Sequence, residues 1–459
     1  MNNPSLPADP AEANDPLGSL SEQETTSYHT AFGSDPKNRL AMNAVTRSDL
    51  SDIAMDRDAF RAVDHHFSDR VHPKGDATSQ KASGRCWLFA GLNVMRLGLM
   101  KEKNIKNIEL SQSYLLFWDK YEKANWHLEC IIQTVNEPLE GRLVSWLLAN
   151  AVPDGGQWDM FVNLIEKYGV VPQSAMPESH SSSATAKMNR LLLHKLREWT
   201  KSLRDAHDEG GSLADLRTLK DRMMAEVYRI LAIHIGEPPS TFDWQYEDKD
   251  EAFHRYEGLT PHRFRDEHLP FNVSDTVCLV HAPTEDKPLN TLLTVSFLGN
   301  VVGGHTTRYA NVSLDTMKKA AIASIQAGEA VWFGCDVGKR FHRDLGVMDT
   351  DLYDYNLVLG TDTALTKADR LNYGDSLMTH AMVFTGVDLR DGKPQKWMVE
   401  NSWGDKVGSK GYFIMTDAWF DEYNYEIVVS KRFVDKAILD IFDQDPIVLA
   451  PWDPMGALA

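Results

Sequence analysis

The apolar residues of this chain repeat with two different periods, and this change of period limits the folds that it can adopt. After Cys86 they stand three or four residues apart, which is the spacing of a helix that packs on one face. They are Leu88, Leu92, Met95 and Leu99. In HAMVFTGVD (380–388) and QKWMVENSW (395–403) they alternate instead, and GYFIMT (411–416) would add a third strand. The sequence therefore predicts a helix that begins at Cys86 and strands in the last third.

The middle of the chain carries two more helical stripes, separated by Gly210-Gly211. Ser212 with Asp215 has the pattern of a capping box that opens the second helix, and Gly236 lies where that helix should end. The stripes are Met188, Leu192, Leu196, Trp199 and Leu203, then Leu216, Leu219, Met223, Val227 and Ile230. They predict a helical arm over about 185–236. Because a projecting arm must bury its apolar stripes, we expect them to pack against a partner subunit.

A hairpin turn is indicated between the two predicted strands of the last third. Asp391-Gly392 is a dipeptide that favours the tight turn of a β-hairpin. His380 stands before this turn and Asn401 after it, at similar distances along the chain. The hairpin therefore brings His380 and Asn401 near each other on adjacent strands.

Composition excludes several classes of protein. The formal net charge of −18 repels phosphate backbones and anionic lipid, and the polar, charge-free stretch 288–307 does not read as a membrane span. The start of the chain has no basic region followed by an apolar one, so we expect a cytoplasmic protein.

Residues 1–26 carry four prolines, five acids and no Lys or Arg, which favours a mobile segment. The four cysteines match no zinc pattern, and we expect neither a metal nor an organic cofactor.

A cysteine at a helix start suits nucleophilic chemistry. The helix N-terminus and a nearby imidazolium both favour the thiolate, and an amide oxygen can hold the imidazole in the correct tautomer. His380 and Asn401 supply that imidazole and that amide. The backbone N–H of Cys86 and the side-chain amide of Gln80 can serve as donors to an oxyanion. These four residues predict an acyl-transfer site.

Three stretches together resemble the signatures of the papain-like cysteine peptidases. They are QKASGRCWLFA (80–90), HAMVFTG (380–386) and VENSWG (399–404). The resemblance implies an α+β fold with Cys86 as nucleophile, His380 as general base and acid, Asn401 as orienting residue and Gln80 as oxyanion donor. It also implies that Trp403 shields the hydrogen bond between His380 and Asn401.

Two departures from papain indicate a branch of this family. Papain itself is expected to carry C-G-S-C-W where this chain has S-G-R-C-W. The distance of 294 residues from Cys86 to His380 exceeds the papain-type spacing of about 130–150, so roughly 150 residues are inserted. With LSQSYLLFWDKYEKAN (110–125), DGGQWDM (154–160) and PWDPMGALA (451–459), the chain is similar to the bleomycin hydrolases and bacterial aminopeptidases C from about residue 27 onward.

That resemblance implies a cysteine aminopeptidase that acts through a thioester acyl-enzyme on peptides with free N-termini, assembled as a homohexamer. Gly155 and Gly156 would then hydrogen-bond the substrate backbone. The C-terminal tail would lie in the cleft, where the carboxylate of Ala459 meets the substrate's α-ammonium. The expected parts are a mobile segment 1–26, catalytic-body segments 27–180 and 251–445, a helical hook 181–250 and the tail 446–459.

Three other readings of the sequence remain as weaker alternatives, and two more are excluded. An ordinary papain-type endopeptidase is the nearest alternative. A transglutaminase-like acyltransferase would place an aspartate where Asn401 stands. The sequence has no H-E-x-x-H pattern of a metallopeptidase, and GVDLRDGKP (386–394) fails as a phosphate-binding loop at Pro394. From another class, a nucleic-acid-binding barrel is suggested by relatives reported to bind DNA, but the charge of −18 argues against it.

Overall fold

The computed structural model describes residues 18–457, which pack as two units. The smaller unit joins residues 18–62 to Asp351–Ala364. Its helices are α1 (Glu22–Ser34), α2 (Pro36–Val45), α3 (Leu50–Ala54), α4 (Arg57–Arg61) and α14 (Tyr355–Leu359). Hydrogen bonds from the backbone N–H of Asp56 to Leu352 and of Asp354 to Ala54 join its two segments. The segment expected to be mobile falls mainly outside the described residues, but Glu22–Thr26 begin α1.

The larger unit, 63–350 with 365–457, has a layer of helices around α5 (Cys86–Glu102). Apolar side chains surround α5 on nearly all sides, as expected of a helix in the centre of a core. Two helices, α6 (Gln112–Gln133) and α8 (Trp158–Tyr168), pack on α5. The same unit contains α7 (Arg142–Ala149), α9 (His180–Ser183) and α12 (Pro261–His268). This layer places Cys86 at the N-terminus of a buried, rigid helix.

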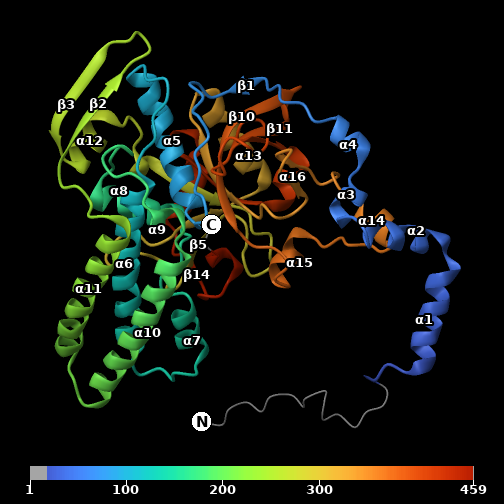
Figure 1. Ribbon diagram of the computed structural model, residues 1–459, viewed down its shortest axis with the longest axis horizontal. Helices are drawn as coiled ribbons and strands as arrows, with labels where there is room; N and C mark the ends of the chain where they lie inside the picture. Colours follow the sequence, from blue (N-terminus) through green and yellow to red (C-terminus); the bar gives the residue numbers. More distant parts are fainter. Residues whose placement is uncertain (1–17, 458–459) are drawn as a thin grey trace. The chain divides into compact units, whose positions relative to one another are not determined.

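The predicted arm is a pair of long helices, α10 (Ala186–Asp208) and α11 (Leu213–Ile235), which run beside α6 at the lower left of Figure 1. Ser212 and Asp215 form the predicted capping box, and Gly236 ends α11 at φ 99°. The hairpin of β2 (Phe242–Glu247) and β3 (Phe253–Leu259) follows and crosses the expected hook boundary at residue 250.

One expectation about this arm is wrong. Its apolar stripes are buried within the chain, on α6 and on each other, instead of waiting for a partner subunit. Leu192, Leu196 and Val227 are already fully buried. The apolar stripes of the two helices therefore give no support for an oligomer.

The second layer is a mixed sheet of twelve strands. Its main path runs β14-β5-β6-β4-β13-β7-β10-β11-β12-β9-β8, and β1 pairs with β10. The strands are β1 (Asp69–Arg70), β4 (Thr276–Val280), β5 (Thr291–Val295), β6 (Tyr309–Asn311), β7 (Val331–Cys335), β8 (Phe341–His342), β9 (Val347–Met348), β10 (His380–Arg390), β11 (Lys393–Glu400), β12 (Tyr412–Thr416), β13 (Asn424–Ser430) and β14 (Ile447–Leu449). The remaining helices are α13 (Leu314–Gln326), α15 (Lys367–Asn372), α16 (Asp417–Tyr423) and α17 (Lys436–Leu439).

The predicted hairpin is formed by β10 and β11. Asp391 and Gly392 both have positive φ, 52° and 74°, as a type I′ turn requires. The antiparallel register pairs Val383 with Glu400, so His380 opens one strand and Asn401 follows the end of the other. Among the described residues no helix is long and apolar enough to cross a membrane.

Candidate active site

Cys86 is the first residue of α5, and its side chain is buried. No side chain caps this helix, so its N-terminal N–H groups remain available to an anion. Burial raises the pKa of the Cys86 thiol to about 11, while backbone N–H groups, that of Ala381 first, act in the opposite direction. The resting thiol is therefore protonated and lies beside the start of β10.

His380 is the residue before Ala381, and its ring is held on one side. His380 Nε2 lies 2.8 Å from Asn401 Oδ1, which also accepts the backbone N–H of Ser402 at 2.8 Å. Trp403 covers this pair, with 5.0 Å between the ring centroids of Trp403 and His380. Burial lowers the pKa of His380 to about 4, and the hydrogen bond to Asn401 partly opposes this shift. The imidazole is therefore neutral at physiological pH.

The side-chain amide of Gln80 is held at both its oxygen and its nitrogen. Ser402 Oγ donates to Gln80 Oε1 at 2.7 Å, and Gln80 Nε2 donates to the carbonyl oxygen of Ser83 at 2.6 Å. A primary amide has two N–H groups, so one remains for a ligand. The structure thus brings together Gln80, His380 and Asn401 through Ser402, a residue that the sequence patterns did not single out.

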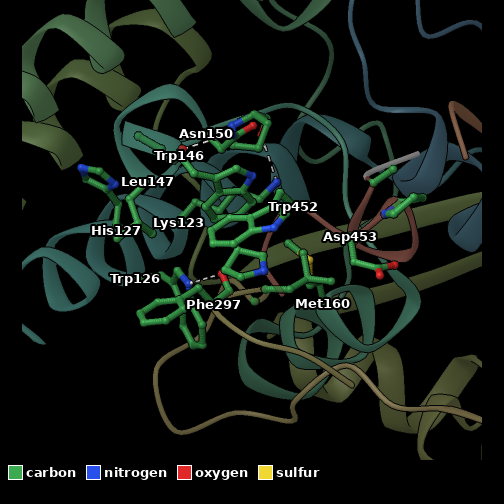
Figure 2. A pocket seen from close by; sticks show the side chains of 18 of the residues that line it. Lys123, Trp126, His127, Trp146, Leu147, Asn150, Met160, Phe297, Trp452 and Asp453 are labelled. Atoms are coloured by element: carbon green, nitrogen blue, oxygen red, sulfur yellow. Dashed lines mark hydrogen bonds between the residues drawn. The ribbon is translucent and has the colours of Figure 1, made fainter. Parts of the chain in front are cut away.

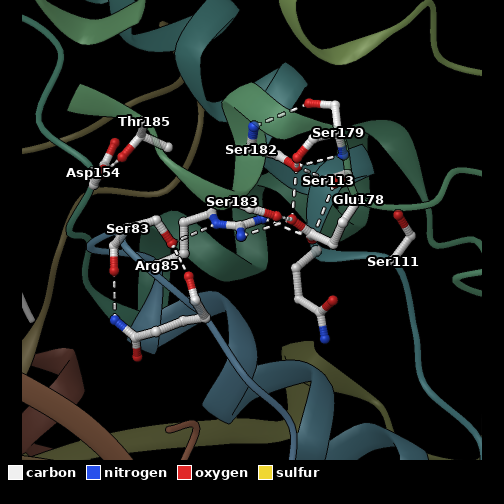
Figure 3. A network of polar contacts seen from close by, with 12 residues as sticks. Ser83, Arg85, Ser111, Ser113, Asp154, Glu178, Ser179, Ser182, Ser183 and Thr185 are labelled. Atoms are coloured by element: carbon white, nitrogen blue, oxygen red, sulfur yellow. Dashed lines mark hydrogen bonds and ion pairs between the residues drawn. The ribbon is translucent and has the colours of Figure 1, made fainter. Parts of the chain in front are cut away.

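Two carboxylates, Glu178 and Asp154, hold the loop that precedes Cys86, and Figure 3 shows Glu178 beside Arg85. Glu178 accepts two hydrogen bonds from the buried guanidinium of Arg85, both at 2.9 Å. Asp154 Oδ2 accepts the backbone N–H of Gly84 at 3.0 Å, and its other oxygen lies 2.7 Å from Lys120 Nζ. Sequence reasoning noted Arg85 as a departure from papain and quoted Asp154 within DGGQWDM, but it assigned no role to Asp154 and did not find Glu178.

Burial opposes the charge of both acids, but their partners outweigh it. Hydrogen bonds from Arg85 hold the pKa of Glu178 below its usual range, and Lys120 does the same for Asp154. Both groups are therefore carboxylates in the folded protein.

Gly155 and Gly156 follow Asp154 directly. The Gly155 carbonyl oxygen accepts a hydrogen bond from Lys123 Nζ at 2.7 Å. A Cβ at Gly156 would lie 2.6 Å from the ring of Trp87, so only glycine lets the backbone pass here. Their expected contact with a substrate backbone stays a prediction.

The C-terminal tail lies next to this glycine pair. The side-chain amide of Gln157 donates to the carbonyl oxygen of Ala457 at 2.5 Å, and Asp453 pairs with the buried Lys287 at 3.0 Å. Met455 is buried. Ala459, the predicted contact of the substrate ammonium, lies outside the described residues.

A cavity of about 550 Å³ separates part of the tail from the body (Figure 2). Its walls are largely apolar, with Trp126 and Trp146 from the body and Trp452 from the tail. Polar groups at its edge already have partners, such as Lys123 with Asp119. Among residues 18–457 no group of three or more His, Cys, Asp or Glu side chains is arranged to hold a metal ion.

A family model described as "Peptidase C1-like family" matches residues 19–456. The chain belongs to this family. Mouse (Mus musculus) bleomycin hydrolase is 47% identical over 449 residues, covering 96% of this chain and 99% of that protein. Aminopeptidase C of Streptococcus thermophilus is 46% identical over 444 residues, covering 96% and 100%. The crystal structure of pepw from Lactobacillus rhamnosis has a TM-score of 0.95 at 46% identity, covering 96% and 100%.

Membership of the peptidase C1-like family confirms the resemblance drawn from the three stretches, and with it the papain-like α+β fold. The chain is a cysteine peptidase, similar to bleomycin hydrolases and aminopeptidases C along almost its whole length.

Proposed function

We propose that this peptidase is an aminopeptidase in which Cys86 is the nucleophile, His380 the general base and acid, and Asn401 the orienting residue. The hydrogen bond of 2.8 Å between His380 and Asn401, at the strand end that lies against the Cys86 helix, carries this proposal. The names of the relatives, bleomycin hydrolase and aminopeptidase C, support the substrate class.

The reaction begins with transfer of the Cys86 proton to His380. The thiolate attacks the carbonyl carbon of the first peptide bond, and the oxyanion accepts hydrogen bonds from the Cys86 backbone N–H and the free N–H of Gln80. The C–N bond breaks as His380 returns the proton to the leaving amine, which leaves a thioester. His380 then deprotonates water, whose attack releases the N-terminal residue and regenerates the thiol.

Proton transfer inside the pair suits the buried site. Burial disfavours both the free thiolate and the free imidazolium, as the raised pKa of Cys86 and the lowered pKa of His380 indicate. Moving one proton from sulfur to nitrogen forms both ions side by side and leaves the net charge unchanged. The N-terminus of α5 further stabilises the thiolate.

We assign to the C-terminal tail the role of restricting the enzyme to substrates with a free N-terminus. It is held at Gln157 and Lys287, beside the loop of Gly155 and Gly156, where it would obstruct a substrate that extends beyond its first residue. A carboxylate at the end of the tail would also favour an α-ammonium.

The test is hydrolysis of aminoacyl fluorophores with free and with acetylated N-termini. An aminopeptidase cleaves the free substrates alone, whereas equal cleavage of acetylated internal-site peptides would establish the papain-type endopeptidase instead. Retention of DNA on filters at low salt would support the nucleic-acid-binding alternative. The cytoplasmic location and the homohexamer stay predictions, and sedimentation as a monomer at micromolar concentration would contradict the hexamer.

A further inference from the structure

We infer that Arg85 and Glu178 are positioning residues for the oxyanion donor of this peptidase. The inference rests on the proposed role of Gln80. It concerns the residue immediately before the nucleophile, whose side chain is fully buried and pairs with Glu178, just before the segment that opens the hook.

A continuous chain of hydrogen bonds joins Arg85 to Gln80. Arg85 Nε donates to Ser83 Oγ at 2.9 Å, and Ser83 Oγ in turn donates to the carbonyl oxygen of Gln80 at 2.6 Å. The carbonyl oxygen of Ser83 accepts from Gln80 Nε2 at 2.6 Å. Ser83 is therefore hydrogen-bonded to both the backbone and the side chain of Gln80, and Arg85 holds the Ser83 hydroxyl in place.

Glu178 fixes Arg85 in turn. The two N–H groups at the end of the guanidinium meet the two carboxylate oxygens, which is the geometry that lysine cannot reproduce. The same carboxylate accepts from Ser113 Oγ on α6 at 3.0 Å and from Ser182 Oγ on α9 at 2.6 Å. All three nitrogens of the Arg85 guanidinium are thereby engaged, and its orientation is set by groups on three segments of the chain.

The backbone makes a parallel connection. The N–H of Ala82 donates to the carbonyl oxygen of Ser183 at 3.0 Å, so the loop before Cys86 is pinned to the segment that leads into α10. Asp154 makes a second connection, since it accepts the backbone N–H of Gly84 and also hydrogen bonds from Thr185 Oγ1 and Asn189 Nδ2 at the start of α10. The start of the hook is therefore joined to the loop before Cys86 at two points, Ala82 and Gly84.

This arrangement has a chemical purpose in the proposed mechanism. An oxyanion donor stabilises the transition state only when it is held at the position where negative charge develops. Gln80 lies in a loop without regular structure, so its amide needs external support. The Arg85, Ser83 and Ser402 contacts supply that support without touching the substrate.

The experiment separates oxyanion binding from thiol reactivity. A peptide aldehyde forms a hemithioacetal with the nucleophile and places its oxygen in the oxyanion site, whereas alkylation by iodoacetamide needs only a reactive sulfur. Arg85→Lys and Ser83→Ala should weaken aldehyde binding about tenfold or more. This effect is smaller than the 10²–10³-fold loss of kcat that is typical when an oxyanion donor is removed completely. The rate of alkylation should stay within about twofold, because the sulfur and His380 are untouched.

Three further variants complete the design. Gln80→Ala is the reference for loss of the donor. Arg217→Lys is the matched control, because Arg217 on α11 donates to the carboxylate of Glu129 on α6 and makes no hydrogen bond to residues 80–86. Arg85→Met with Glu178→Gln removes both charges together, so that no buried charge is left unpaired. This double variant should fold and still bind the aldehyde weakly.

The inference is overturned if Gln80→Ala loses aldehyde affinity while the Arg85 and Ser83 variants keep it. It is also overturned if those variants lose aldehyde affinity and alkylation rate to the same extent, because that pattern indicates general loosening of the site. If Gln80→Ala itself binds the aldehyde as the wild type does, the oxyanion role in the proposed function fails, and with it the premise of the inference.

Discussion

The Oδ1 atom of Asn401 faces Nε2 of His380 at 2.8 Å and also accepts the backbone N–H of Ser402. The second contact identifies this atom as the amide oxygen, because a backbone N–H needs an acceptor. An amide oxygen accepts only, so the proton of the neutral imidazole must be on Nε2. The lone pair of Nδ1 is then available for the proton of Cys86.

Replacing His380 should therefore be far more damaging than replacing Asn401. His380→Ala removes the proton acceptor, whereas Asn401→Ala leaves a base that spends part of its time in the wrong tautomer or orientation. We expect Asn401→Ala to retain measurable turnover of aminoacyl fluorophores and His380→Ala to retain almost none. Equal, complete loss in two folded variants would show that Asn401 does more than orient the ring.

Cys86→Ala should abolish turnover and leave the fold intact. The substitution removes one buried sulfur at a helix start, where alanine is well tolerated. Turnover and circular dichroism should be measured on the same preparation, with Cys130→Ala as the matched control, because Cys130 is a buried thiol on α6. Activity that survives in folded Cys86→Ala would refute the assignment of the nucleophile.

Weakening the tail anchor should broaden the substrate range. Lys287 is buried between Asp453 of the tail and Asp286 of the body, at 3.0 and 2.8 Å. Asp453→Asn removes the charge that holds the tail, whereas Asp286→Asn changes the same lysine without touching the tail. Cleavage of an N-acetylated peptide should rise in Asp453→Asn and in a variant lacking 455–459, but not in Asp286→Asn. If both tail variants refuse the blocked peptide while hydrolysing free substrates normally, the tail does not set the specificity.

Stability should fall as the pH is lowered from 7 to 5, in part because of His127. Burial lowers the pKa of His127 to about 4, whereas an unfolded histidine titrates near 6.5. Below pH 6.5 the unfolded chain therefore binds a proton that the folded chain does not, so stability is lost as pH falls. His127→Gln should reduce the loss in unfolding free energy between pH 7 and 5 by about 2 kcal/mol. An unchanged loss in denaturant titrations would exclude His127 as a contributor.

The hairpin and the Cys86 helix could be predicted because their signals are local. Asp391-Gly392 specifies a turn with two positive φ angles, and the turn fixes which residues of the two strands meet. The partners of Arg85 could not be predicted in this way. Glu178 lies 93 residues away, and any acid near the loop would satisfy the same guanidinium. The tertiary fold selects Glu178, because it also places Ser113 of α6 and Ser182 of α9 on the same carboxylate.

The burial of the hook stripes shows the same limit. Periodicity located both helices and the capping box at Ser212, but it does not say which surface covers an apolar face. That surface is α6, which precedes the hook in the chain and is buried along most of its length. An apolar stripe therefore predicts that its face of the helix is buried. Only the tertiary fold determines whether the covering surface belongs to the same chain or to another subunit.

The position of the β10–β11 hairpin also sets when cleavage becomes possible during synthesis. A ribosome-bound chain that has emerged only as far as residue 379 contains Cys86 and its helix but neither His380 nor Asn401. Because the missing pair sits on one short hairpin, base and orienting amide arrive together, after the hook has been made. With the roles proposed above, a growing chain carries the Cys86 thiol without its base until this hairpin has been made.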